Sequence, residues 1–311
     1  MYISYILSHD TFFYNPDLKS MILCPFSYSQ VSFLASIVVL SYNERQLYKE
    51  FVIYKNKKEG LKNMRIELFH IGPITIWGYG FMIGLGILLC LILGMQRAKK
   101  RSMSENAVLD IAIYGVLAGF LGAKLLYVLV EFDRFMENPS SILGSEGFVV
   151  YGGITAGILT AIVYCKIKKL HFLEYFDLLI PSVALAQGFG RIGCFLAGCC
   201  YGRETDSFLG VTFPENSLAP SGVSLLPTQL FSAAGDFLIM GILLWYSKRA
   251  KRSGDVGILY MFLYSIGRFL IEILRSDERG SLGALSTSQW ISIGILVLAI
   301  VLKFISKKKE N

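Results

Sequence analysis

Seven long apolar segments, separated by short charged ones, dominate the chain from about residue 73 onward. A helix needs about 20 mainly apolar residues to cross the hydrocarbon core of a bilayer. The pattern therefore predicts an all-α, polytopic integral membrane protein with seven transmembrane helices. The predicted spans lie near residues 73–95, 107–130, 148–165, 174–198, 227–247, 256–274 and 285–305.

The charges between these spans predict the orientation of the protein. The first, third and fifth loops and the C-terminal tail are basic, the second and fourth loops carry several acidic residues, and the sixth is balanced. Basic loops are retained in the cytoplasm. We therefore expect the C-terminus to be cytoplasmic. A cysteine introduced into the fourth loop should react with a reagent added from outside.

The composition supports a membrane protein and excludes other classes. The chain is 54% hydrophobic and 17% charged, whereas soluble domains are about 45–50% apolar and about 25% charged. The net charge of +7 resides in basic loops, which argues against nucleic acid as a partner. No cofactor is predicted. The three histidines and six cysteines lack zinc-type spacing, so no metal site is predicted either.

Three cysteines, Cys194, Cys199 and Cys200, cluster at the outer end of the fourth span. A metal site there would need further ligands that the sequence does not show. Adjacent cysteines do not readily bridge each other, although disulfides form outside the cytoplasm. A reactive thiol at Cys194 or Cys199 is a third interpretation, and the sequence does not decide among them.

The first 63 residues do not resemble the membrane domain, which we assign to residues 64–311. Their one apolar run, residues 31–40, is too short to cross a bilayer. Lys58-Glu59-Gly60 can be encoded by a purine-rich ribosome-binding sequence shortly before Met64. We interpret residues 1–63 as an extension of doubtful translation; a genuine extracytoplasmic tail is the alternative. A purified chain of 34.7 kDa would contradict our interpretation.

Ionisable side chains inside the spans are the first candidates for function. Each costs about 2.5–3.5 kcal/mol at a helix centre, so such residues usually face a cavity or a partner. Arg268 and Glu272 are four residues apart and can pair on one helical face. Taken alone, this pair is equally well explained as a structural salt bridge. The candidates among the charged residues within the predicted spans are Asp110, Lys124, Arg191, Asp236, Arg268 and Glu272.

Arg191 has no acidic partner on its own span. It either shares Glu272 or binds an anion, and a guanidinium group suits the bidentate recognition of phosphate. Two converging arginines would favour a phospholipid headgroup. The glycine-rich segments "GVLAGFLGAK" and "YGGITAG" predict close packing between spans.

The chain resembles a known family, the prolipoprotein diacylglyceryl transferases. The resemblance covers residues 64 to about 305. It is carried, in order, by "IGPITIWGYGFM", "YGVLAGFLGAKLLYVL", "GFGRIGCFLAGCCYGRETD", "LGVTFPENS", "LPTQLFSAAGDFL", "YSIGRFLIEILR" and "LSTSQWISI".

The resemblance implies a seven-helix enzyme of the bacterial cytoplasmic (inner) membrane. Such an enzyme transfers the diacylglyceryl group of phosphatidylglycerol to the lipobox cysteine of a prolipoprotein signal peptide, the first step of lipoprotein maturation. Membrane lipids are its other partners. By position, Arg191 would hold the lipid headgroup, Arg268 would stabilise the leaving phosphate and Glu272 would orient Arg268. Gly202 would end the signature, and Tyr79 would line the cleft.

Several positions depart from the family pattern. Tyr151 replaces the usual histidine and could donate a hydrogen bond, but a tyrosine with a pKa of about 10 is a poor base at neutral pH. Cys194 replaces an asparagine and Lys124 replaces an arginine, and by position we expect both to bind substrate. Cys199 replaces a polar or acidic residue. These departures leave the lipid-binding arginines in place and alter the acceptor side. The alternative function is a divergent paralogue that binds phospholipid but uses another acceptor or is non-catalytic.

Overall fold

The computed structural model describes residues 67–71, 74–137, 139, 147–277 and 281–308. Seven helices in these residues are long and apolar enough to cross a membrane, which confirms the predicted all-α architecture. They are α2 (Gly78–Lys100), α3 (Glu105–Val130), α6 (Val150–Ile167), α7 (Phe172–Ala197), α8 (Thr228–Tyr246), α9 (Asp255–Leu274) and α10 (Thr287–Lys308). The predicted extension, residues 1–63, lies outside the described part of the chain.

The first predicted span is displaced by about one helical turn. Ile74–Trp77 forms strand β2, which pairs antiparallel with β1 (Glu67–Ile71), so the helix begins only at Gly78. The β-branched run Ile-Thr-Ile, which directly follows a proline, favours this extended conformation. At its other end α2 continues through the basic residues that were assigned to the first loop. Cations in a last helical turn interact favourably with the helix dipole, so these residues can remain helical.

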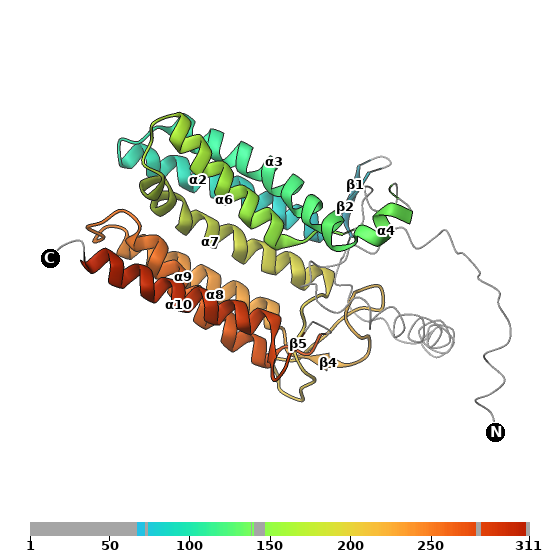
Figure 1. Cartoon of the computed structure of the whole chain (residues 1–311). Coiled ribbons are helices and arrows are strands. Elements are labelled where there is room, and N and C mark those ends of the chain that lie inside the picture. Colours follow the sequence, from blue (N-terminus) through green and yellow to red (C-terminus); the bar gives the residue numbers. More distant parts are fainter. Residues whose placement is uncertain (1–66, 72–73, 138, 140–146, 278–280, 309–311) are drawn as a thin grey trace, which may run out of the picture.

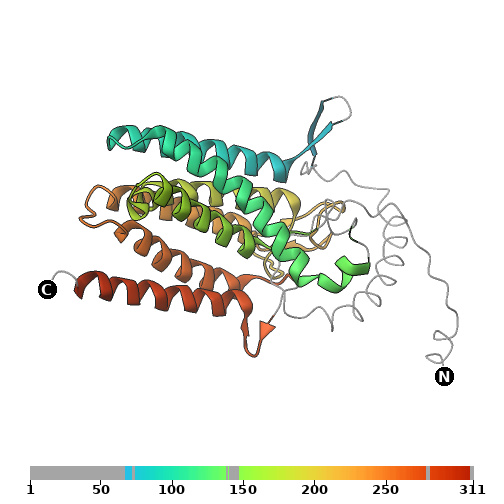
Figure 2. The same ribbon diagram turned by 45° about the horizontal axis from the view of Figure 1, so that its top comes forward.

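Helix α7 lies at the centre of the bundle (Figure 1). It packs against α2 on one side and α8 on the other, while α3 packs against α6 and α10 against α9. Figure 2 shows α10 along one edge of the bundle, far from α2 and α3. The central position explains why a fourth span that contains several glycines and alanines is buried along much of its length.

The predicted close packing of the glycine-rich segments occurs between α3 and α6. A Cβ atom added at Gly122 would lie 2.7 Å from the carbonyl oxygen of Gly152, and one added at Gly153 would lie 2.9 Å from that of Gly119. Real Cβ atoms do not approach backbone this closely. The two backbones therefore touch directly, as small residues allow in membrane helices.

The two ends of the bundle differ. The hairpin β1–β2, the short helix α4 (Phe132–Glu137) and strands β4 and β5 all lie at one end, whereas the C-terminus lies at the other (Figure 1). The irregular end also holds the bridge between Gly202 and Arg275, which joins the ends of α7 and α9. Two pairings of two-residue strands complete this end: β3 (Val211–Thr212) with β4 (Ser224–Leu225), and β5 (Ser281–Leu282) with β6 (Leu285–Ser286).

At the opposite end, a buried carboxylate of α7 holds the start of α9. Asp177 accepts hydrogen bonds from the backbone N–H groups of Gly254, at 2.7 Å, and Gly257, at 2.8 Å. The first N–H groups of a helix have no partner within the helix. Asp177 supplies that partner from 77 and 80 residues away.

Candidate active site

Arg191 projects from the C-terminal half of α7 and is only partly exposed. Its guanidinium makes no hydrogen bond and no ion pair with any residue that the structure describes. Glu272, the partner considered from sequence, is engaged elsewhere. Of the two explanations for Arg191, the structure does not show a shared Glu272. The explanation that remains is an external anion that binds Arg191.

Glu272, which is buried, lies between two arginines. Its Oε2 atom is 3.0 Å from Nη2 of Arg268 and 3.7 Å from Nη1 of Arg275. Arg275 also donates to both carboxylate oxygens of Asp277, at 2.9 and 2.6 Å. The predicted Arg268–Glu272 pair thus exists and is the inner part of a larger network, which fixes the direction of the Arg268 side chain.

Arg268 retains donor capacity after these contacts. Its Nη2 atom also donates to Oγ of Ser288, at 3.0 Å. Its Nη1 atom is buried and has no hydrogen-bond partner among the described residues. A buried donor without a partner costs free energy, so this atom is suited to a ligand that supplies an acceptor.

Arg191 and Arg268 line one small cavity of about 50 Å³ between α7, α8 and α9. Asp236 of α8, which is 7% exposed, lines the same cavity, as does Tyr264 of α9. The walls are completed by Phe231, Ser232, Gly235, Ile239, Gly267 and Ile271. Two guanidinium groups and one carboxylate in a confined, mostly apolar setting favour an anionic ligand such as a phosphate.

Comparison with known proteins agrees with this chemistry. The family model for prolipoprotein diacylglyceryl transferase matches residues 66–305. The chain belongs to this family. It is 50% identical over 249 residues to a phosphatidylglycerol–prolipoprotein diacylglyceryl transferase 2 of Clostridium perfringens, covering 79% of this chain and 97% of that protein. The corresponding enzymes of Clostridium tetani and Clostridioides difficile are 48% and 35% identical, over 76% and 78% of this chain and 96% of each relative.

Among the positions where the chain departs from the transferase pattern, Tyr151 lies near the arginine cavity. It stands in the first turn of α6 and is 38% exposed. Arg268, Glu272 and Tyr264 are its electrostatic neighbours. Tyr151 is therefore close enough to Arg268 for their side chains to interact electrostatically, although it is not a wall of the cavity itself.

Tyr79 and Cys194 lie together, and Cys194 is an electrostatic neighbour of Arg191. Tyr79 of α2 packs against the cysteine cluster, and a Cβ atom added at Gly193 would lie 3.2 Å from its ring. The sulfur atoms of Cys194, Cys199 and Cys200 lie within 4.8 Å of one another, and all three residues are buried. Sequence spacing placed these cysteines in one segment but did not predict that their sulfurs converge.

The backbone after α7 carries Cys199 and Cys200 in a turn held by α8. The side chains of Thr228 and Gln229 donate hydrogen bonds to the carbonyl oxygens of Cys200, at 2.8 Å, and Cys199, at 2.7 Å. A hydrogen bond from the thiol of Cys194 lowers the pKa of Cys200 to about 6, against the effect of burial and with help from the positive charges of Arg275 and Arg191. Cys200 is thus the thiol of this group with thiolate character at neutral pH.

Gly202 has a structural position at the end of the signature. Its N–H group donates to the carbonyl oxygen of Leu226, at 2.9 Å. A Cβ atom there would lie 2.7 Å from the Thr228 side chain. No side chain fits at this position without displacing the start of α8, so Gly202 acts by allowing α7 and α8 to meet near the site.

Lys124, predicted to bind substrate, is not a wall of the arginine cavity. Its amine lies over the rings of Tyr127 and Phe148, at 5.4 and 4.9 Å from the ring centroids, and 3.5 Å from the carbonyl oxygen of Gly147. These contacts place it at the junction of α3 with the segment before α6.

Two ionisable residues of the cavity, Asp236 and Tyr264, were absent from the predicted site. Asp236 had been recognised as an ionisable residue within a span, and that cost was a sufficient signal to include it. Tyr264 lies four residues before Arg268 on α9, so the helical repeat places both on one face. Its neutral side chain gave no comparable signal.

Proposed function

We propose that this chain transfers the diacylglyceryl group of phosphatidylglycerol to the lipobox cysteine thiol of a prolipoprotein. The observation that carries the proposal is the pair of arginines in one cavity: Arg191 without a partner in the described residues, and Arg268 with an unused buried donor. The names of the transferase relatives supply the two substrates. The lipid phosphate would supply an anion to Arg191 and an acceptor to the unused Nη1 donor of Arg268.

In the proposed reaction, the thiol sulfur attacks the glyceryl carbon that carries the phosphate ester. A carbon–sulfur bond forms, the carbon–oxygen bond breaks, and glycerol phosphate departs as an anion. Arg268, held in direction by Glu272, stabilises the charge that grows on the leaving phosphate, and Arg191 holds the headgroup. Fixed donors in a confined site stabilise such charge without reorganisation.

The thiol must lose its proton during this reaction. We propose that Asp236 accepts this proton as the general base. Asp236 contributes the carboxylate in the cavity and makes no hydrogen bond or ion pair with another described residue. Tyr151 then acts as a hydrogen-bond donor to the substrate. This assignment explains how the enzyme works with tyrosine where the family usually has histidine.

We place the reaction at the outer face of the cytoplasmic membrane, with the C-terminus in the cytoplasm. The arginine cavity is in the half of the bundle that leads to the hairpin and the long fourth loop, whereas the basic loops and the C-terminus lie at the other end. The positive-inside rule assigns that basic end to the cytoplasm. The lipobox cysteine of an exported signal peptide would therefore meet the site from outside.

A transfer assay tests the proposal. Membranes that contain the chain would be incubated with a lipobox peptide and phosphatidylglycerol, and mass spectrometry would detect a diacylglyceryl thioether on the cysteine. We expect product with the parent chain and none when the peptide cysteine is replaced by serine. Phosphatidylglycerol binding without any product would contradict the transferase assignment and favour a lipid-binding paralogue.

A further inference from the structure

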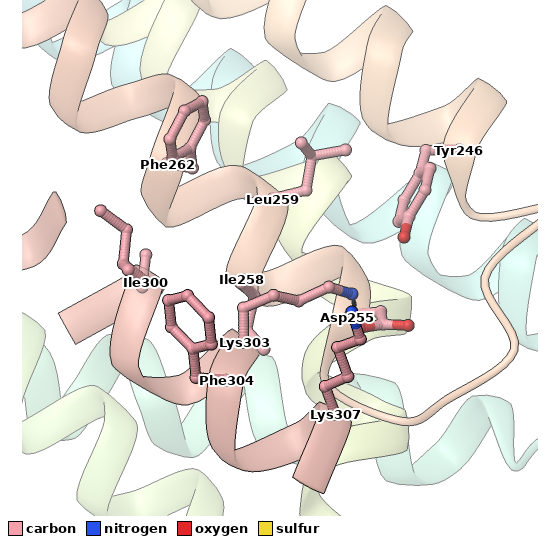
Figure 3. Close-up of a pocket in the computed structure, with 10 residues that line it drawn as sticks. Tyr246, Asp255, Ile258, Leu259, Phe262, Ile300, Lys303, Phe304 and Lys307 are labelled. Atoms are coloured by element: carbon pink, nitrogen blue, oxygen red, sulfur yellow. Dashed lines mark hydrogen bonds and ion pairs between the residues drawn. The ribbon is translucent and has the colours of Figure 1, made fainter. Parts of the chain in front are cut away.

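A second charged groove lies at the opposite end of the bundle, between α8, α9 and α10 (Figure 3). Its volume is about 340 Å³. Residues 246, 255, 303 and 307 line one end of it, close to the termini of the three helices, and this is where the helices reach the membrane surface. It shares no lining residue with the arginine cavity.

The groove has a polar end and an apolar end. In Figure 3 the lysine side chains of Lys303 and Lys307 extend toward Asp255, while Phe262, Ile300 and Phe304 surround the other end. Phe304 is 70% exposed, on a helix whose composition suits a membrane span. In a bilayer this apolar end faces hydrocarbon, so an acyl chain is the material that fills it.

The charges at the polar end are unbalanced. Lys303 uses one of its donors on Asp255, at 2.6 Å. Lys307 has no ion pair or hydrogen bond with any described residue, and the same holds for the hydroxyl group of Tyr246. The amines of Lys303 and Lys307 and the single carboxylate of Asp255 give this end of the groove a net positive charge. Donors that make no hydrogen bond to a described residue therefore lie beside the apolar part of the groove.

We propose that this groove is a binding site for an anionic phospholipid of the cytoplasmic leaflet, separate from the catalytic site. The phosphate would be held by Lys303 and Lys307, with Tyr246 as a further donor, and one acyl chain would lie along Phe262 and Phe304. Basic pockets between helices on the cytoplasmic side bind anionic headgroups in this way. The lipid would join α9, which carries Arg268, to α10.

A photocrosslinking experiment on the full chain tests this site directly. Phe304 would be replaced by benzoylphenylalanine, and the protein would be reconstituted in nanodiscs of equal parts dioleoyl phosphatidylglycerol and dioleoyl phosphatidylcholine. Mass spectrometry would then identify the crosslinked lipid. The same crosslinker at Ile305, at the same depth but outside the groove, reports the surrounding bilayer.

We expect position 304 to label phosphatidylglycerol at least about tenfold over phosphatidylcholine, since each lysine at an anionic surface contributes about fivefold. Lys307→Gln should reduce this ratio about fivefold, whereas Lys248→Gln, which removes a cation outside the groove, should not change it. Equal labelling of both lipids, insensitivity to Lys307→Gln, or crosslinks to protein instead of lipid would each overturn the proposal. Because the readout is the adduct, the result does not depend on transferase activity.

Discussion

Replacing Arg191 should remove activity without removing stability. If its guanidinium makes two charge-assisted hydrogen bonds to a phosphate, each is worth about 1.5–3 kcal/mol. Arg191→Lys keeps the charge and loses the two-pronged geometry, so kcat/KM should fall by about 10- to 150-fold. Arg191→Ala should lose both bonds and fall by about 10²- to 10⁴-fold. Unfolding should not change, because the side chain has no partner in the described part of the protein.

Arg268 provides the matched contrast. Its removal takes away the 3.0 Å contact with Glu272 and leaves that buried carboxylate with Arg275 at 3.7 Å. Breaking a buried ion pair costs about 3–5 kcal/mol when no partner remains; the remaining arginine should limit the loss to the lower end of that range. Arg268→Ala should therefore lose both activity and thermal stability. Arg249→Ala, in the loop after α8, should lose neither.

The assay is the formation of diacylglyceryl thioether on a lipobox peptide, measured over a range of phosphatidylglycerol concentrations, with thermal unfolding of each variant in the same detergent. If the activity of Arg191→Ala is within about twofold of the parent, Arg191 does not hold the lipid headgroup. A loss of stability in Arg191→Ala equal to that in Arg268→Ala would refute the inference that Arg191 lacks an internal partner.

Three further experiments test other parts of the structure. Asp236→Asn should lower kcat at pH 7 with little change in KM for the lipid. The activity of this variant should recover as the pH rises through about 8.5, because a thiol ionises there without a base. A loss of activity that does not depend on pH would contradict the role of Asp236 as base. Alkylation of Cys200 by a small reagent, followed by peptide mass spectrometry, should rise with pH through about 6 and level off above it, because the thiolate is the reactive form. In Cys194→Ala the midpoint should move up toward the ordinary thiol value, and a parent midpoint already near 8.5 would contradict the lowered pKa. Gly152→Val should prevent α3 and α6 from packing, because the valine side chain would overlap Leu126 and the backbone of Gly122. Thermal unfolding of the detergent-solubilised protein measures this effect. The control Gly84→Ala should leave thermal unfolding unchanged, because a Cβ atom at Gly84 contacts nothing.

The sequence was sufficient for the spans because a bilayer imposes a local rule. About 20 apolar residues must occur together, and their ends are marked by charges that can be read directly. The rule misplaced the start of the first span, where the apolar run Ile74–Trp77 belongs to a hairpin. Hydrophobicity alone does not distinguish a strand at the membrane surface from the first turn of a helix, whereas the proline and the β-branched residues do.

The site was predictable to the extent that its contacts are local or costly. Arg268 and Glu272 are four residues apart on one helix, so their pairing follows from the helical repeat. Asp177 holding the start of α9, and Asp236 sharing a cavity with Arg191, involve helices far apart in sequence. No periodicity reports such contacts. They follow from how α7 packs, and the sequence gives only the small residues that make its packing close.

The two arginines of the cavity therefore have different physical roles. Arg268 is fixed before substrate arrives, because Glu272 and Ser288 hold one of its nitrogen atoms and leave the other unused. Arg191 is not fixed by any described contact, and its charge is offset within the cavity by Asp236. An anionic headgroup would bind both arginines at once. The Asp236 carboxylate would then no longer offset the charge of Arg191 and could accept a proton. Binding of the lipid would thus prepare Asp236 to act as the base, which couples capture of the donor to activation of the acceptor thiol.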